Sequence, residues 1–244
     1  MDVIKLCKVE LYRFFHSMSI IKYAAVFTLF LLFMSYFNIA FMDEDITSEL
    51  VWASLMSNFL YLLAIVCVII ALYIGREFRQ KTFHYEIMSG YSINVISFSK
   101  SITCGIIIPI ILIACILLYF GLLGNGFNKE YSIRFIYMFI LFLHICLSTV
   151  IYVLIWRNAV LGGCFAFIKF LIFESIIVTI VGNLLSLDIA GSISYLTVFN
   201  QWYALIDVEN TLDSRCTMCI ILSALAEYFI LHILIYFRYK KCDM

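Results

Sequence analysis

Residues 75–100 read GREFRQKTFHYEIMSGYSINVISFSK, and the rest of the chain is arranged around this polar stretch. Long apolar runs lie on both sides of it, and its charges are mainly basic, with Arg76, Arg79, Lys81 and Lys100 against Glu77 and Glu86. Because loops rich in lysine and arginine stay on the cytoplasmic side of membrane proteins, we expect this segment in the cytoplasm. Its helix-compatible residues and lack of proline predict one or two short helices that present a face to a cytoplasmic partner.

The composition of the chain is that of a membrane protein. Of its 244 residues, 65% are hydrophobic and 13% are charged, whereas soluble domains are about half apolar and about a quarter charged. The unbroken apolar runs, the single proline and only 10 glycines favour helices over a β-barrel, which shows short alternating segments. We therefore predict an all-α polytopic membrane protein, with residues 1–244 forming one transmembrane domain.

Two kinds of ligand are disfavoured by the same composition. The formal net charge is zero, which argues against a nucleic-acid partner. The nine cysteines lack the spacing of metal ligands, and most of them lie inside apolar runs. We expect them to act as small hydrophobic residues, so no metal site is predicted.

Six apolar runs are long enough for the roughly 20 residues that a bilayer-spanning helix needs. They predict transmembrane helices at about residues 20–41, 50–74, 101–123, 135–156, 159–185 and 216–237. Before the first run, residues 1–17 carry apolar side chains at helical spacing with lysines and an arginine between them. This pattern indicates an amphipathic helix in the cytoplasmic interface, and the alternative is that it begins the first span.

The distribution of lysine and arginine predicts the orientation of the six helices. With both termini inside, twelve basic residues are cytoplasmic and three are outside, namely Lys129, Arg134 and Arg215. The twelve are Lys5, Lys8, Arg13, Lys22, Arg76, Arg79, Lys81, Lys100, Arg157, Arg238, Lys240 and Lys241. The link at 156–158 is so short that the helices on either side of it must be antiparallel neighbours.

The longest outer segment covers residues 186–215 and is rich in aromatic side chains. Tyr195, Phe199, Trp202 and Tyr203 are typical of a short helix or a re-entrant hairpin at the outer interface. An ordinary aromatic belt explains the same residues. Both interpretations stay open at this point.

Three charged residues fall inside the predicted spans: Lys169, Glu174 and Glu227. Such residues are costly in hydrocarbon and usually face the interior of the bundle or a wet cavity. On an α-helix, Lys169 and Glu174 lie about 140° apart, which predicts that they do not pair on one face. Glu227 or a second subunit is then the partner of either. One hypothesis makes the three residues a substrate path or a proton site, and the other makes them interhelical contacts with Lys169 reaching toward the cytoplasm.

Motifs of catalysis are absent from the sequence. It contains no H-E-x-x-H, no G-x-S-x-G and no G-x-x-x-x-G-K-[ST]. We therefore predict that the chain is not an enzyme and does not hydrolyse ATP itself.

The order of residues in the cytoplasmic segment resembles the permease subunits of ABC-2 type exporters. The resemblance rests on Glu77, then Lys81-Thr82, then Gly90-Tyr91-Ser92, and then Ser99-Lys100 at the start of the third span, together with the predicted topology. Ile93 stands where these permeases usually have an arginine. In size and character the chain is most similar to the small bacterial permeases of lantibiotic- and bacitracin-type peptide export and self-immunity.

This resemblance implies a multi-pass protein of the bacterial cell membrane that works with cytoplasmic ATPase subunits, a second permease and membrane lipid. ATP and magnesium would bind in the ATPase, with no cofactor in this chain. A helix at about 77–88, with Glu77 in its first turn, would contact the ATPase. The residues assigned to this contact are Arg76, Glu77, Phe78, Lys81, Thr82, Phe83, Tyr85, Ile87, Gly90 and Ser92.

Two other functions fit the sequence less completely. An ion- or proton-coupled carrier would use Lys169, Glu174 and Glu227, although the chain has neither an internal repeat nor paired glycine- or proline-broken spans. A membrane scaffold without transport is the third hypothesis.

Overall fold

The computed structural model of the chain describes residues 2–16, 19–40, 47–123, 129–176, 179–180, 197–206 and 214–240. Within these ranges the protein is helical and has no strand. The elements are α1 (Asp2–His16), α2 (Ser19–Ala40), α3 (Ser48–Ser57), α4 (Phe59–Arg79), α5 (Thr82–Met88), α6 (Ile93–Leu123), α7 (Lys129–Trp156), α8 (Ala159–Ile168), the π-helix η1 (Lys169–Phe173), α11 (Val198–Ile206) and α12 (Ser214–Lys240).

Five helical stretches in the described part of the chain are long and apolar enough to cross a membrane. They are Phe59–Arg79, Ile93–Leu122, Tyr131–Trp156, Ala159–Ile176 and Thr217–Tyr239. The all-helical fold and its multi-pass character agree with the sequence prediction. The predicted first span, 20–41, coincides with α2, which is not among these five. A sixth span, the cytoplasmic position of the termini and the interfacial position of α1 stay predictions.

The predicted span 50–74 is wrong in its boundaries, because the run is divided at Asn58 into α3 and α4. The Asn58 side-chain amide donates to the carbonyl of Ser54 at 2.8 Å. A side chain that bonds a backbone carbonyl in this way competes with the helical hydrogen-bond ladder. The membrane-crossing stretch is therefore α4, which begins after the break and ends at Arg79.

The third span also begins earlier than predicted, at Ile93 instead of residue 101. Gly90 takes a left-handed conformation with φ of 87°, which glycine adopts without strain. Two residues later, the Ser92 hydroxyl accepts a hydrogen bond from the Val95 N–H at 3.4 Å and caps the new helix. The first two turns of α6 thus lie inside the segment that the sequence assigns to a cytoplasmic loop.

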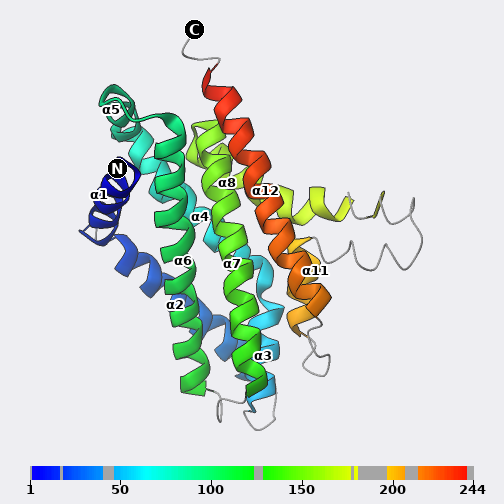
Figure 1. Cartoon of the computed structure of the whole chain (residues 1–244). Helices are drawn as coiled ribbons and strands as arrows, with labels where there is room; N and C mark the ends of the chain where they lie inside the picture. Colours follow the sequence, from blue (N-terminus) through cyan, green and yellow to red (C-terminus); the bar gives the residue numbers. More distant parts are fainter. Residues whose placement is uncertain are drawn as a thin grey trace.

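The core of the molecule is a bundle in which α6, α7 and α12 run side by side (Figure 1). Helix α8 returns antiparallel to α7, as the short link predicts, and Asn158 caps it by accepting the Val160 and Leu161 N–H groups at 2.9 and 3.2 Å. Glycines let α8 approach α4 closely. A Cβ at Gly163 would lie 2.9 Å from the Ala71 Cβ, and one at Gly75 would collide with Ala159.

The two ends of the bundle are built differently (Figure 1). At one end, α1 and α5 lie with the last turns of α12, where the Phe83 and Tyr239 rings are 5.7 Å apart. At the other end, α3 and α11 bond reciprocally. The Trp52 indole donates to the Leu205 carbonyl at 3.0 Å, and the Trp202 indole donates to the Met56 carbonyl at 2.9 Å.

Helix α11 lies within residues 186–215, for which the sequence predicts a short helix or a re-entrant hairpin. It confirms a short helix in this segment, and Trp202 on it is buried while Tyr203 is exposed. Tyr195 and the rest of 186–196 lie outside the described residues, as do residues 207–213.

Candidate functional site

A buried cluster of charges joins four helices at the end of the bundle that holds α1 and α5. Lys100 of α6 lies at its centre, with its ammonium nitrogen 3.1 Å from Glu10 Oε1 and 3.3 Å from Glu86 Oε2, and it forms a further ion pair with Glu77. Arg13 completes the group at 2.7 Å from Glu86 Oε1 and 3.2 Å from Glu10 Oε1. We call these five residues the Lys100 cluster.

The Lys100 cluster contains three carboxylates and two permanent cations, so it carries one excess negative charge when all are ionised. Lys100 is only 1% exposed and Glu10 is fully buried. Burial raises the pKa of the Glu10 carboxyl, and the neighbouring Glu77 carboxylate raises it further. Burial also raises the pKa of Glu86. Burial in the folded chain thus favours the protonated form of both carboxyls.

The prediction of one helix at 77–88 is wrong. Glu77 lies in the last turn of α4, and the chain turns at Gln80 and Lys81 before α5 begins. Lys81 has a φ of 57°, a left-handed conformation that ends the first helix. Glu77 is thus at a helix C-terminus, where a negative charge is unfavourable, and Lys100 supplies the compensating charge.

The residues assigned to the ATPase contact fall into three groups by exposure. Arg76, Lys81, Tyr85, Gly90 and Ser92 are exposed, while Phe78, Thr82 and Ile87 are partly buried, and Glu77 and Phe83 are buried. Helix α5 consequently has an inner face that packs on the bundle and an outer face open to solvent. On the outer face, Tyr85 is 60% exposed and Met88 is 71% exposed.

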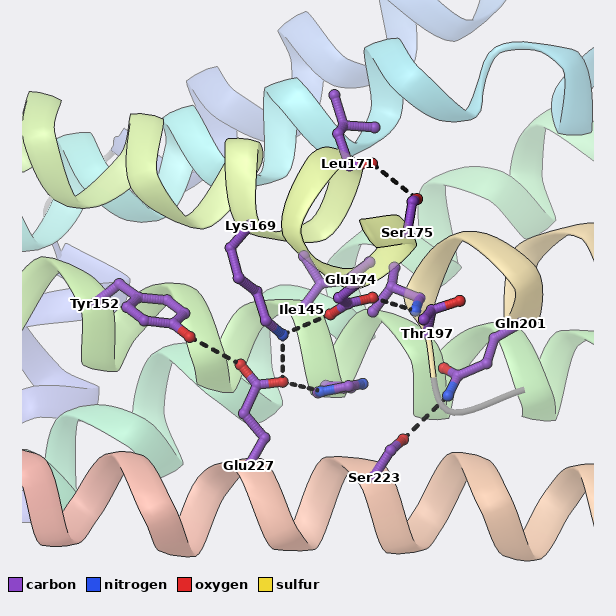
Figure 2. A network of polar contacts seen from close by, with 12 residues as sticks. Ile145, Tyr152, Lys169, Leu171, Glu174, Ser175, Thr197, Gln201, Ser223 and Glu227 are labelled. Atoms are coloured by element: carbon purple, nitrogen blue, oxygen red, sulfur yellow. Dashed lines mark hydrogen bonds and ion pairs between the residues drawn. The ribbon is translucent and has the colours of Figure 1, made fainter. Parts of the chain in front are cut away.

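A second cluster lies where η1 meets α7 and α12. Figure 2 shows Lys169 pointing between the carboxylates of Glu174 and Glu227. The Lys169 ammonium is 2.5 Å from Glu174 Oε1 and 2.6 Å from Glu227 Oε2. Glu227 Oε2 also lies 2.7 Å from His144 Nε2, and the Tyr152 hydroxyl donates to Glu227 Oε1 at 3.3 Å. We call these five residues the Lys169 cluster.

The prediction that Lys169 and Glu174 cannot pair on one face is wrong, and the π-helix is the reason. In η1 the Glu174 N–H bonds the Lys169 carbonyl, five residues back. An i→i+5 bond brings residue i+5 above residue i, as an α-helix does for residue i+4. The contact between Lys169 and Glu227, one of the partners that the sequence left open, is confirmed.

Glu174 extends the Lys169 cluster to α11. Its Oε2 accepts the Val198 N–H at 2.6 Å, at the first residue of α11. A carboxylate at a helix N-terminus is stabilised by the free N–H groups and by the helix dipole. The Glu174 side chain therefore connects η1 to α11 directly, and it connects both to α12 through the Lys169–Glu227 ion pair.

Sequence reasoning missed several members of both clusters: Glu10, Arg13, Glu86, Lys100, His144 and Tyr152. His144 has no ionisable neighbour on its own helix within hydrogen-bond spacing, and its partner Glu227 lies on another span. The signal that finds it is the presence of ionisable side chains on two separate spans, since such groups must meet to be tolerated in hydrocarbon.

Comparison with models of known protein families gives no match, and comparison with curated proteins gives none either.

Proposed function

We propose that this chain is the membrane-spanning subunit of an ABC exporter that moves an amphipathic peptide or a lipid-like molecule out of the membrane. Separate cytoplasmic ATPase subunits, which bind ATP and magnesium, supply the work. A second permease, identical or paralogous, completes the transport pathway. The site of action is the cell membrane of a bacterium, and antibiotic peptides of the lantibiotic type are the proposed substrates.

The observation that carries this proposal is the construction of α5. The helix connects two membrane-crossing helices directly, α4 and α6, with short turns on both sides. Its inner face is fixed by Phe83 in the core and by Glu86 in the Lys100 cluster. Its outer face offers an aromatic ring and a methionine, side chains that are enriched at protein interfaces.

This construction suits the transmission of force from a partner. A push on Tyr85 acts on a short, stiff helix whose Glu86 is bonded to Lys100 inside α6 and to Arg13 inside α1. Nucleotide-driven closure of the ATPases would move α5 and, through these ion pairs, tilt α6 and α1 together. Lys169, Glu174 and Glu227 then lie along the proposed substrate path between α8 and α12.

The test is purification of the tagged chain from its native membrane in detergent, followed by an ATPase assay. We expect a P-loop protein of domain size to co-purify with ATPase activity. Substitutions Y85A and M88A should weaken its retention about tenfold, the loss typical of an interface anchor. L122A is the matched control, because Leu122 is 73% exposed at the opposite end of α6. If the chain is isolated alone, or if L122A weakens retention equally, the proposal is wrong.

A second candidate function is favoured by one observation, the Lys169 cluster. Ionisable groups of both signs that meet between spans are typical of ion-coupled carriers. In a carrier, E174Q and E227Q abolish transport, and no ATPase is needed. In an ATP-driven exporter the same substitutions only modulate transport, whereas E77A uncouples it from ATP hydrolysis by disturbing the Lys100 cluster.

A further inference from the structure

The Lys169 cluster has one permanent cation for two carboxylates. Lys169 contacts both Glu174 and Glu227, and these three charges sum to minus one while the His144 ring is neutral. An unbalanced charge between membrane helices is costly, because hydrocarbon and packed side chains solvate it poorly. One additional proton on the cluster makes the sum zero.

Among the ring nitrogens and carboxylate oxygens of the cluster, one atom has no hydrogen bond within the described part of the chain. Both carboxylates accept hydrogen bonds at each of their oxygens, Glu227 from His144, Lys169 and Tyr152, and Glu174 from Lys169 and the Val198 N–H. Since Glu227 accepts from His144 Nε2, this nitrogen carries a hydrogen in the neutral ring. The other ring nitrogen, Nδ1, is buried and has no hydrogen-bond partner among the described residues.

We propose that the Lys169 cluster is a proton-binding site in which His144 takes up one proton from water at Nδ1 while its Nε2–H stays bonded to Glu227. The proton turns the imidazole into a cation, so that two positive and two negative side chains face one another. The side chains of Lys169 and Glu227 are each 16% exposed, so they are the outermost charged members of the cluster around its buried ring.

Among the described residues, the charged and titratable groups of the cluster come from the elements packed around His144. Glu227 on α12 contacts the ring directly. Figure 2 shows the residues around that glutamate: Lys169 on η1, Glu174 directly after η1, and Tyr152 two turns further along α7. Helix α12 contributes only Glu227 to the cluster. Loss of the proton removes the cation that Glu227 contacts on α7, so deprotonation weakens the attachment of α12 to α7. This inference concerns the isolated chain and stands apart from the exporter proposal.

The experiment uses the full chain in lipid nanodiscs with ¹⁵N-labelled histidine and with His16 and His84 replaced by asparagine. ¹⁵N chemical shifts, recorded between about pH 5 and pH 8, report both the tautomer and the protonation of each ring. We expect the Nε2–H tautomer of His144 at high pH and one proton gained at Nδ1 on acidification. E227Q should weaken proton binding at least about tenfold, and K169Q should strengthen it by a similar factor, because they remove opposite charges beside the ring.

His232 is the internal reference, since its ring bonds the uncharged Tyr228 hydroxyl at 2.8 Å. Its titration should not respond to E227Q or K169Q. A second measurement covers the case in which a variant misfolds: on a pH jump, the unmodified chain should release one more proton than H144Q, as read by an indicator dye. The proposal is overturned if His144 keeps one protonation state throughout, if its titration is indifferent to E227Q, or if H144Q releases as many protons.

Discussion

Lys100 and Lys169 are both lysines between helices that hold several carboxylates, yet their surroundings differ. Lys100 is 1% exposed, and the second cation of its cluster is Arg13, which is always charged. The Lys169 side chain is 16% exposed. Its partner Glu227 also contacts a histidine, His144. Each cluster has an excess of one carboxylate over permanent cations. In the Lys100 cluster, a proton can neutralise this excess negative charge by binding to a buried carboxyl. In the Lys169 cluster, the imidazole of His144 is a further group that can bind it.

This difference indicates that the two clusters have different roles in holding the helices together. The Lys100 cluster ties α1, α4, α5 and α6 into one body through contacts between residues up to 90 positions apart in the sequence. The Lys169 cluster joins η1, α7, α11 and α12 and contains a histidine, His144, among its carboxylates. The former suits a permanent joint, and the latter suits a contact that opens.

Removal of the central lysine should produce the largest effect. In K100M, three buried carboxylates lose their common partner, which we expect to lower the free energy of unfolding by about 3–5 kcal/mol. K169M is the matched comparison. It should cost less, about 1.5–3 kcal/mol, because Glu227 keeps His144 and Glu174 keeps the Val198 N–H. Equilibrium unfolding in mixed micelles measures both, and equal losses would remove the distinction between the clusters.

The π-helix gives a second test of the Lys169 cluster. Insertion of one alanine after Ile172 turns Glu174 away from Lys169 and should cost about 1.5–3 kcal/mol, the value of a charged hydrogen bond. Deletion of Ile172 should cost far less, because it converts the π turn to an α turn in which the same glutamate is four residues from Lys169. Unfolding free energies of the two variants, with a Lys169–Glu174 double-mutant cycle in each, decide the matter. Equal costs would contradict the alignment by η1.

Acidification should strengthen the attachment of α1. The pKa values of Glu10 and Glu86 are raised by burial, so the folded chain binds protons that the unfolded chain releases. Their contribution to stability is complete below the unfolded glutamate pKa and is lost as the pH rises through the higher folded value. Hydrogen exchange of the α1 amides, corrected for the intrinsic rate, should therefore slow as the pH is lowered from neutral. E10Q should flatten this dependence, and an unchanged profile in E10Q would exclude Glu10 as its source.

The smallest effect is expected at the edge of the Lys100 cluster. The Arg13 side chain is 41% exposed, so water screens its contacts with Glu10 and Glu86. R13Q should lower the free energy of unfolding by about 1 kcal/mol or less. A loss comparable to that of K100M would show that the cluster depends on its charge count more than on burial.

The apolar runs were predictable because hydrophobicity over about 20 residues is a local property of the sequence. The early start of α6 was not, since Lys100 looks like the polar end of a loop until Glu10, from a distant helix, is placed beside it. The break at Asn58 was missed because neither proline nor glycine marks it. At the break the Asn58 side chain bonds the Ser54 carbonyl, a contact that no sequence pattern announces.

In the candidate site, the sequence identified the charges but not their geometry. Lys169, Glu174 and Glu227 were selected because charge inside a span is rare, which is a statement about composition. The angle between Lys169 and Glu174 was computed for an ideal α-helix, and nothing in the local sequence predicts η1. His144 was passed over because a histidine among apolar neighbours is ordinary until a carboxylate from another helix meets it.

The glycine contacts between α4 and α8 also connect the two charge clusters. With no side chain at Gly75 and Gly163, α4 and α8 pack so closely that a Cβ on either glycine would clash with an alanine of the other helix. Helices α4 and α8 therefore form a closely packed pair. Glu77 lies two residues beyond Gly75, and Lys169 lies six residues, about 9 Å, beyond Gly163. Because α4 carries Glu77 of the Lys100 cluster and α8 leads into Lys169, a larger residue at either glycine would disturb the helix pair that lies between the two clusters.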